Sequence, residues 1–107
     1  MTKDELIEFH KNACDKMHET LKRKNADYTG MSTDPFANFT TAEDLGICST
    51  EQGFLVRLTD KFKRIITFVK KGVLLVADET VEDTLFDMAN YCIIMAAFVR
   101  SKKNDNK

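Results

Sequence analysis

Residues that bend or break a chain are scarce in this sequence. Its 107 residues include one proline, four glycines and no tryptophan, a composition that favours helices over turn-rich β-structure. The three cysteines are an odd number without motif spacing, which argues against a disulfide framework and for a reducing compartment. No apolar run is long enough to span a bilayer, and the first residues lack the apolar stretch of a signal peptide. We therefore expect a cytoplasmic protein without a membrane partner.

Charge of one sign is not in excess either. The formal net charge is −1, with 31% charged and 43% hydrophobic residues, so there is no basic field of the kind that drives non-specific nucleic-acid binding. A chain of this length builds one modest core. We expect a single all-α domain over residues 1–100 and a disordered polar tail over residues 101–107.

The hydrophobic pattern is helical along most of the chain. Apolar residues recur at the helical period in three segments, which predicts three long helices over residues 4–24, 50–71 and 80–100. Gly72 is expected to end the second of these helices. Residues 25–49 are loop-rich, with a short helical turn expected at 41–45, capped by Thr41 and stopped by Gly46. Residues 73–77 form a short apolar connection between the last two long helices.

The last long helix is expected to begin with a cap and to become almost entirely apolar. Thr80 and Asp83 form a shortened capping box, while residues 91–99 are apolar nearly all the way round. Two neighbouring helices cannot enclose such a helix, so the pattern predicts a helical-bundle homo-oligomer. Cys14 and Cys92 fall on apolar helical positions and are expected to be buried, whereas Cys48 is expected in a loop.

Aromatic residues punctuate the loop-rich segment and have two interpretations. Long loops with their own apolar anchors, here including Phe36 and Phe39, are often binding loops or lids. Alternatively, these rings cover the open end of the helical bundle.

Charged residues gather on one face of each of the last two helices. Asp83, Asp87, Asn90 and Tyr91 share a helical face, and a second set lies on a face of the preceding helix. That set consists of Arg57, Lys61 and Arg64, with Asp60 among them. The two faces either meet across a ligand or are ordinary solvated surfaces, with Asp60 and Arg64 in an intrahelical ion pair. His10 and His18 have no third ligand at useful spacing, so a zinc site is not expected.

Four fragments, in order, resemble the nucleotide-modification-associated domain proteins found largely in bacteriophages. They lie at residues 24–28 (KNADY), 35–39 (PFANF), 53–64 (GFLVRLTDKFKR) and 78–91 (DETVEDTLFDMANY). That family is similar to the all-helical MazG-like nucleotide pyrophosphohydrolases. The resemblance implies a phosphorylated nucleoside ligand and a helical dimer or larger assembly, in the cytoplasm of an infected or lysogenic bacterium.

The resemblance also suggests roles for individual residues. Asn38 and Tyr91 fall in matching fragments and join the expected ligand-binding set. Tyr28 or Phe39 would stack on the base, and Asp83, Asp87 and Asn90 would contact sugar or base. The residues expected to hold phosphates are Lys24, Arg57, Lys61 and Arg64. In one version the protein does no chemistry and sequesters a nucleotide signal of host immunity, such as a cyclic nucleotide.

An enzymatic alternative requires magnesium and no other cofactor. Asp60, Glu79, Asp83 and Asp87 would hold the ion in a MazG-like nucleoside triphosphate pyrophosphohydrolase. The first metal motif of the MazG-like enzymes is missing, because the polar face of residues 50–71 offers Asp60 among the cations Arg57, Lys61 and Arg64. At an effective dielectric near 20, a cation about 4 Å from the metal costs roughly 4 kcal/mol per unit of ion charge. Binding is thus favoured over hydrolysis, and a structural oligomer or protein-interaction module is the third hypothesis.

Overall fold

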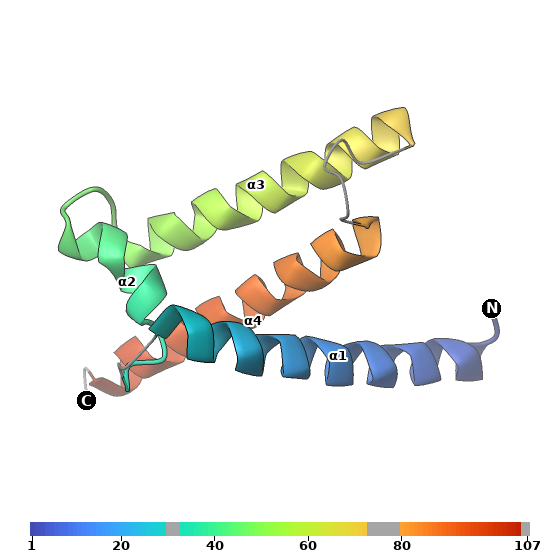
Figure 1. The fold of residues 1–107 in the computed structure, drawn as a ribbon, viewed down its shortest axis with the longest axis horizontal. Coiled ribbons are helices and arrows are strands. Elements are labelled where there is room, and N and C mark those ends of the chain that lie inside the picture. Colours follow the sequence, from blue (N-terminus) through green and yellow to red (C-terminus); the bar gives the residue numbers. More distant parts are fainter. Residues whose placement is uncertain (30–32, 73–79, 106–107) are drawn as a thin grey trace. The chain divides into compact units, whose positions relative to one another are not determined.

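The computed structural model describes residues 1–29, 33–72 and 80–105, with the side chains of 26–29 and 105 excepted. Within these ranges the secondary structure is helical, without strands, which confirms the predicted all-α class. The helices are α1 (Lys3–Thr29), α2 (Ala37–Asp44), α3 (Thr50–Lys71) and α4 (Val81–Asp105), drawn in Figure 1. They belong to two compact units, Met1–Pro35 and Phe36–Lys107.

The first unit is built on α1, which is longer than the predicted 4–24. Its start is fixed by a capping box that the sequence reasoning missed. The Thr2 hydroxyl accepts from the Glu5 backbone N–H at 3.1 Å, and the Glu5 carboxylate accepts from the Thr2 N–H at 3.4 Å. Because the described residues of this unit form no second helix, the apolar stripe of α1 is exposed, with Leu6 at 57%. The predicted burial of Cys14 is therefore wrong.

Helix α2 begins earlier than expected. The predicted cap, Thr41, lies inside the helix, where its hydroxyl donates to the Ala37 carbonyl at 3.0 Å. The turn after Pro35 starts the helix instead, with Phe36 at the N-cap and no side-chain cap. Gly46 adopts a φ of 75°, which glycine allows without strain, and this confirms the predicted stop.

Helix α3 has the predicted bounds. A capping box starts it, since the Gln52 N–H donates to the Ser49 hydroxyl at 3.1 Å and the Ser49 N–H donates to the Gln52 side chain at 2.9 Å. Gly72 ends it in the left-handed region at a φ of 77°, as predicted. Cys48 lies in the short connection between α2 and α3, also as predicted.

Helix α4 is capped as predicted and runs further than predicted. The Thr80 hydroxyl accepts from the Asp83 N–H at 3.0 Å, and the Asp83 carboxylate accepts from the Thr80 N–H at 3.3 Å. The helix ends at Asp105 rather than near residue 100. Lys102 and Lys103 in its last turn are favourable beside the helix C-terminus, which carries a partial negative charge.

An aromatic cluster holds α2, α3 and α4 together. Phe54 is fully buried, and Phe39 and Phe98 are each 8% exposed. Phe39 stacks on Phe54 with 4.6 Å between ring centroids, and Phe36 meets Phe98 edge-on at 5.4 Å. Phe36 and Phe39 therefore cover one end of the α3–α4 pair, as the second interpretation of the loop-rich segment expected for these two rings.

Candidate functional site

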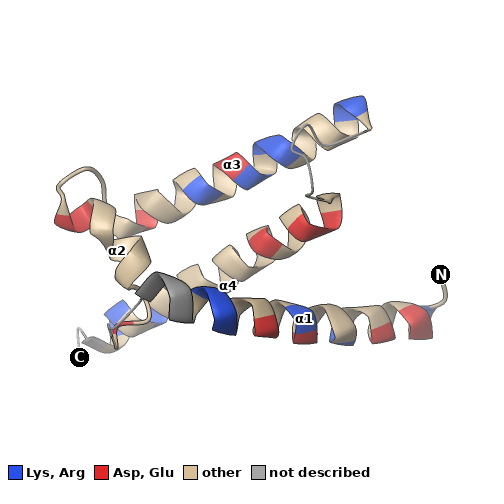
Figure 2. Cartoon of the chain, in the orientation of Figure 1, with Lys and Arg blue, Asp and Glu red and all other residues tan. Residues whose placement is uncertain are grey.

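The two long helices of the second unit run antiparallel, and two polar contacts between them show which residues lie opposite each other. Lys102 of α4 donates to Glu51 near the start of α3 at 3.0 Å. Further along, Lys61 of α3 donates to Asp87 of α4 at 3.1 Å. Basic residues follow α3 and acidic residues occupy the first half of α4 (Figure 2). We call the following set the charged face: Arg57, Lys61, Arg64, Asp83, Asp87, Asn90 and Tyr91.

The ion pair at the centre of the charged face is largely withdrawn from water. The Lys61 side chain is 13% exposed and that of Asp87 is 21% exposed. In contrast, the Lys11–Asp15 pair on α1 has side chains exposed by 72% and 70%. Desolvating two charges is costly, and their mutual attraction often only balances that cost. The two faces, which were expected to meet across a ligand or to be solvated, meet here through a direct ion pair. Such a pair often adds little net stability.

Arg57 brings together predicted site residues from three helices. Its guanidinium donates to the backbone carbonyl of Asn38 at 3.2 Å. It also lies 4.4 Å from the centre of the Phe39 ring and 5.8 Å from that of Tyr91, which are cation–π distances. Because Phe39 is nearly buried and also stacks on Phe54, little of its ring is accessible to a nucleobase. In this structure Phe39 instead positions Arg57.

The remaining members of the charged face have local partners. Arg64 pairs with Asp60 one turn away on α3 at 3.7 Å, as the sequence suggested, and the Asp60 side chain is 66% exposed. Asp83 caps α4 through the Thr80 N–H. Asn90 is half-buried on α4. The charged face therefore holds cations in defined positions beside hydrogen-bonding groups.

Three predicted site residues are not assembled with this face. Lys24 belongs to the first unit, whereas the charged face belongs to the second. The Tyr28 side chain and Glu79 lie outside the described residues. Their roles stay predictions.

The three described carboxylates of the expected magnesium set, Asp60, Asp83 and Asp87, each have another partner. Among the described residues, no three His, Cys, Asp or Glu side chains gather closely enough to hold a metal ion. Asp87 accepts from an ammonium group, Asp60 pairs with a guanidinium, and Asp83 serves as a cap. Magnesium needs several oxygen ligands in near-octahedral geometry, and adjacent cations repel it.

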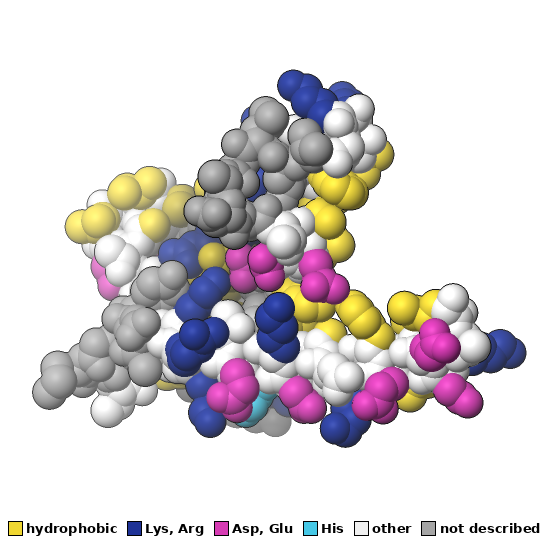
Figure 3. Space-filling model, turned by 45° about the vertical axis from the view of Figure 1, so that its right-hand side comes forward, with side chains coloured by type: hydrophobic (Ala, Val, Ile, Leu, Met, Phe, Trp, Pro, Cys, Tyr) yellow, Lys and Arg dark blue, Asp and Glu magenta, His cyan; other side chains and the backbone are white. Residues whose placement is uncertain are grey.

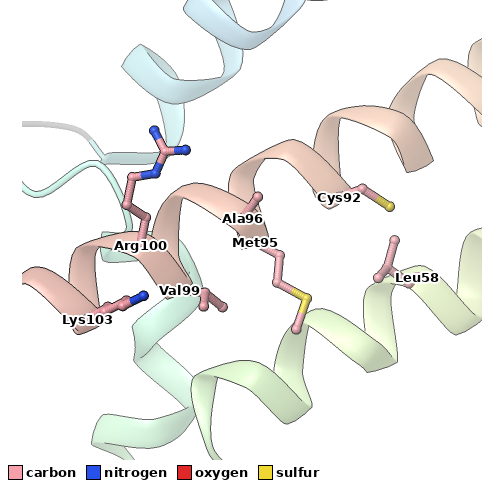
Figure 4. A pocket seen from close by; sticks show the side chains of 7 residues that line it. All are labelled: Leu58, Cys92, Met95, Ala96, Val99, Arg100 and Lys103. Atoms are coloured by element: carbon pink, nitrogen blue, oxygen red, sulfur yellow. The ribbon is translucent and has the colours of Figure 1, made fainter.

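A groove lies on a different side of α4 from Asp87. Its volume is about 520 Å³, and Met95 extends from α4 toward α3 within it (Figure 4). The groove is lined by Leu58, Cys92, Met95, Ala96, Val99, Arg100 and Lys103. Cys92 is exposed here, so its predicted burial is wrong. The physical reason is that the aromatic cluster covers the side of α4 that carries Tyr91 and Phe98, and Cys92 lies on another side of the helix.

Helix α3 also exposes apolar side chains. Leu55 is 55% exposed, Phe62 52% and Val69 75%. Hydrophobic atoms are visible beside the basic end of α3 in the space-filling view (Figure 3). The α3–α4 pair thus has a charged face and a separate apolar surface.

One polar contact of the pair was not predicted. The hydrogen bond from Lys102 lowers the pKa of the Glu51 carboxyl, a backbone hydrogen bond lowers it further, and partial burial opposes both. The Ser-x-x-Gln pattern at residues 49–52 signals the start of α3. The partnership with Lys102 depends on the register of two helices, which spacing within one helix does not give.

Comparison with known families identifies the segment that carries the charged face. A family model described as nucleotide modification associated domain 1 matches residues 43–97, slightly more than half of the chain. The chain belongs to this family. Membership confirms the resemblance at the family level, and the matched segment spans all of α3 and the face of α4 that carries Asp87. Neither the curated proteins nor the solved structures include a match to the chain.

Within the ranges that the structure describes, no helix combines the length and apolar character needed to cross a membrane.

Proposed function

We propose that this member of the nucleotide modification associated domain 1 family binds a phosphorylated nucleoside on the charged face. The observation that carries the proposal is the Lys61–Asp87 pair, held largely out of water inside the family segment. An ion pair withdrawn from water often adds little net stability, so recognition of a charged ligand is the role that we propose for it. The family description supports nucleotides as the ligand class.

The cations of α3 suit a phosphate. The Arg57 guanidinium has five N–H donors and uses one on the Asn38 carbonyl, while the Lys61 ammonium has three. A phosphate between Arg57 and Lys61 would compete with Asp87 for the ammonium group. Arg64, one turn further along α3, would contact a second phosphate.

The α4 side of the charged face suits the sugar or base. Asp87 and Asn90 offer hydrogen-bond acceptors, and Asn90 also offers donors. Tyr91 lies beside Arg57 and is half-buried, so its ring is the better-placed aromatic surface of the described site. Lys24 and Tyr28 of the first unit remain proposed ligands.

In this proposal the protein binds its nucleotide without hydrolysing it. Sequestration of a nucleotide signal, linear or cyclic, requires affinity and no catalytic group. The magnesium-dependent, MazG-like alternative is not favoured, because the acidic residues of the described site are engaged with cations or backbone.

Calorimetric titration of nucleoside phosphates and cyclic nucleotides, with magnesium and with a chelator, tests this function. We expect binding in the chelator, with the ligand recovered intact by chromatography. Arg57→Ala should weaken binding about tenfold or more, consistent with loss of a charge-assisted contact worth roughly 1.5–3 kcal/mol. Lys63→Ala, an exposed cation on α3, is the matched control and should bind normally. Normal binding by Arg57→Ala, or turnover that requires magnesium, would contradict the proposal.

A further inference from the structure

We propose that a second copy of this chain covers the groove on α4, with the two α4 helices packed antiparallel and crossing at Cys92. This inference is independent of nucleotide binding, because the groove and Asp87 lie on different sides of α4. The groove-side residues of α4 make an exposed apolar seam. Leu85 is 46% exposed and Val99 50% exposed, and Cys92 between them is also exposed.

The seam has the spacing of a helix–helix interface. Leu85, Cys92 and Val99 succeed one another at two-turn intervals, which keeps them on one side of the helix. Ala96 beside them is small and exposed, so a second helix can approach closely there. With Cys92 at the crossing point, residues equally far before and after it face each other. Leu85 then meets the second copy's Val99, and each contact occurs twice, as in any two-fold interface.

Charge selects the second copy as the occupant and the antiparallel direction. Arg100 and Lys103 line one end of the groove, so an occupant needs negative charge at that end. The first turn of α4 carries Glu82, which lies on the same edge of the helix as Arg100 by helical periodicity. Antiparallel packing sets Glu82 against the second copy's Arg100. Parallel packing would keep Glu82 and the second copy's Arg100 at opposite ends of the interface, so this ion pair could not form.

Cross-linking through Cys92 tests the crossing point. In Cys14→Ser/Cys48→Ser protein, diamide should oxidise two Cys92 thiols to one disulfide. Diamide accepts the two electrons and two protons that the thiols release. We expect a covalent dimer on a non-reducing gel. Protein that retains only Cys48 is the matched control and should stay monomeric on the gel. Absence of the Cys92 dimer in folded protein would overturn the proposal. An intrachain Cys14–Cys92 disulfide in the unaltered protein would do so as well, since it would assign the groove to α1.

A second pair of variants tests the direction. In a background with all three cysteines replaced by serine, Leu85→Cys and Val99→Cys should cross-link when the two proteins are mixed and not when either is alone. Cross-linking of each variant alone would show parallel packing and contradict the proposal. Glu82→Arg or Arg100→Glu should each weaken dimerisation about tenfold in sedimentation experiments. The double variant should restore it, and failure of that rescue would exclude the proposed ion pair.

Discussion

The α3–α4 pair has an aromatic end and a charged middle, and only a few turns of helix separate them. At the aromatic end, Phe54 and Phe98 exclude water and leave few polar groups to satisfy. In the middle, Lys61 and Asp87 are partly buried and carry full charges. Burial of aromatic rings stabilises a fold strongly, whereas a buried ion pair often contributes little net stability. The aromatic end is therefore expected to supply most of the stability, and the charged middle is where we propose that the ligand binds.

The aromatic end should give the largest stability effect. Phe54→Ala removes a fully buried ring and should lower the free energy of unfolding by about 3–5 kcal/mol. Urea denaturation at fixed protein concentration measures the change. Phe62→Ala, at a ring that is 52% exposed, is the matched control and should cost far less. Equal losses for the two variants would show that the aromatic cluster does not hold the unit together.

The charged middle should behave differently in single and double variants. Lys61→Met leaves a partly buried carboxylate beside an apolar chain and should cost about 1–3 kcal/mol of stability. Lys61→Met/Asp87→Leu removes both charges and should recover most of that loss. Thermal unfolding checks both. If the double variant is much less stable than Lys61→Met, the ion pair is a main source of stability. That result would contradict the contrast between the aromatic end and the charged middle.

The cap of α4 should have a smaller effect. Thr80→Ala removes the hydroxyl that accepts from the Asp83 N–H and should cost about 1 kcal/mol. Thr59→Ala, at an exposed position within α3, is the control and should change stability little. Hydrogen exchange would localise the loss to the first turn of α4. A loss spread evenly over α3 and α4 would contradict a local capping role.

The smallest effect concerns the ion pair beside the aromatic end. Hydrogen bonding to Lys102 lowers the pKa of Glu51 in the folded protein. The resulting stability is complete above the unfolded pKa of the carboxyl and is lost as pH falls through the lower folded pKa. Because both side chains are more than a third exposed, the contribution is screened and should stay below about 1 kcal/mol.

Glu51→Gln should make the free energy of unfolding fall less steeply as the pH is lowered through the acid range. Glu8→Gln, an exposed carboxylate of α1, is its control and should keep the slope of the unaltered protein. Identical slopes for Glu51→Gln and the unaltered protein would show that the Glu51–Lys102 pair does not contribute to the pH dependence of stability.

Local signals predicted the helices well. The Thr80–Asp83 box and Gly72 set boundaries through contacts within a few residues, and both boundaries were confirmed. Thr41 misled the prediction because a threonine hydroxyl can also bond the carbonyl one turn back, inside a helix. The end of α4 was placed too early because polar residues continue a helix as readily as a tail.

Sequence spacing predicted which residues share a helical face, but it did not predict their contacts. Helical spacing placed Lys61 and Asp87 on facing surfaces, but it did not show that they touch. Nor did it show that Phe39 packs in the core beneath Arg57. Both contacts depend on the register of packed helices. The two cysteine predictions failed for a related reason, since an apolar position is buried only where a second element covers it.

The most direct test of the central claim compares nucleotide binding by the unaltered protein and by Lys61→Met/Asp87→Leu. Calorimetry in the presence of a chelator would be performed after circular dichroism has confirmed that both are folded. The account predicts that the unaltered protein binds a nucleoside phosphate and that the folded double variant does not. Equal binding by the two proteins would place the ligand elsewhere, and no binding by the unaltered protein to any nucleotide would contradict the proposed function.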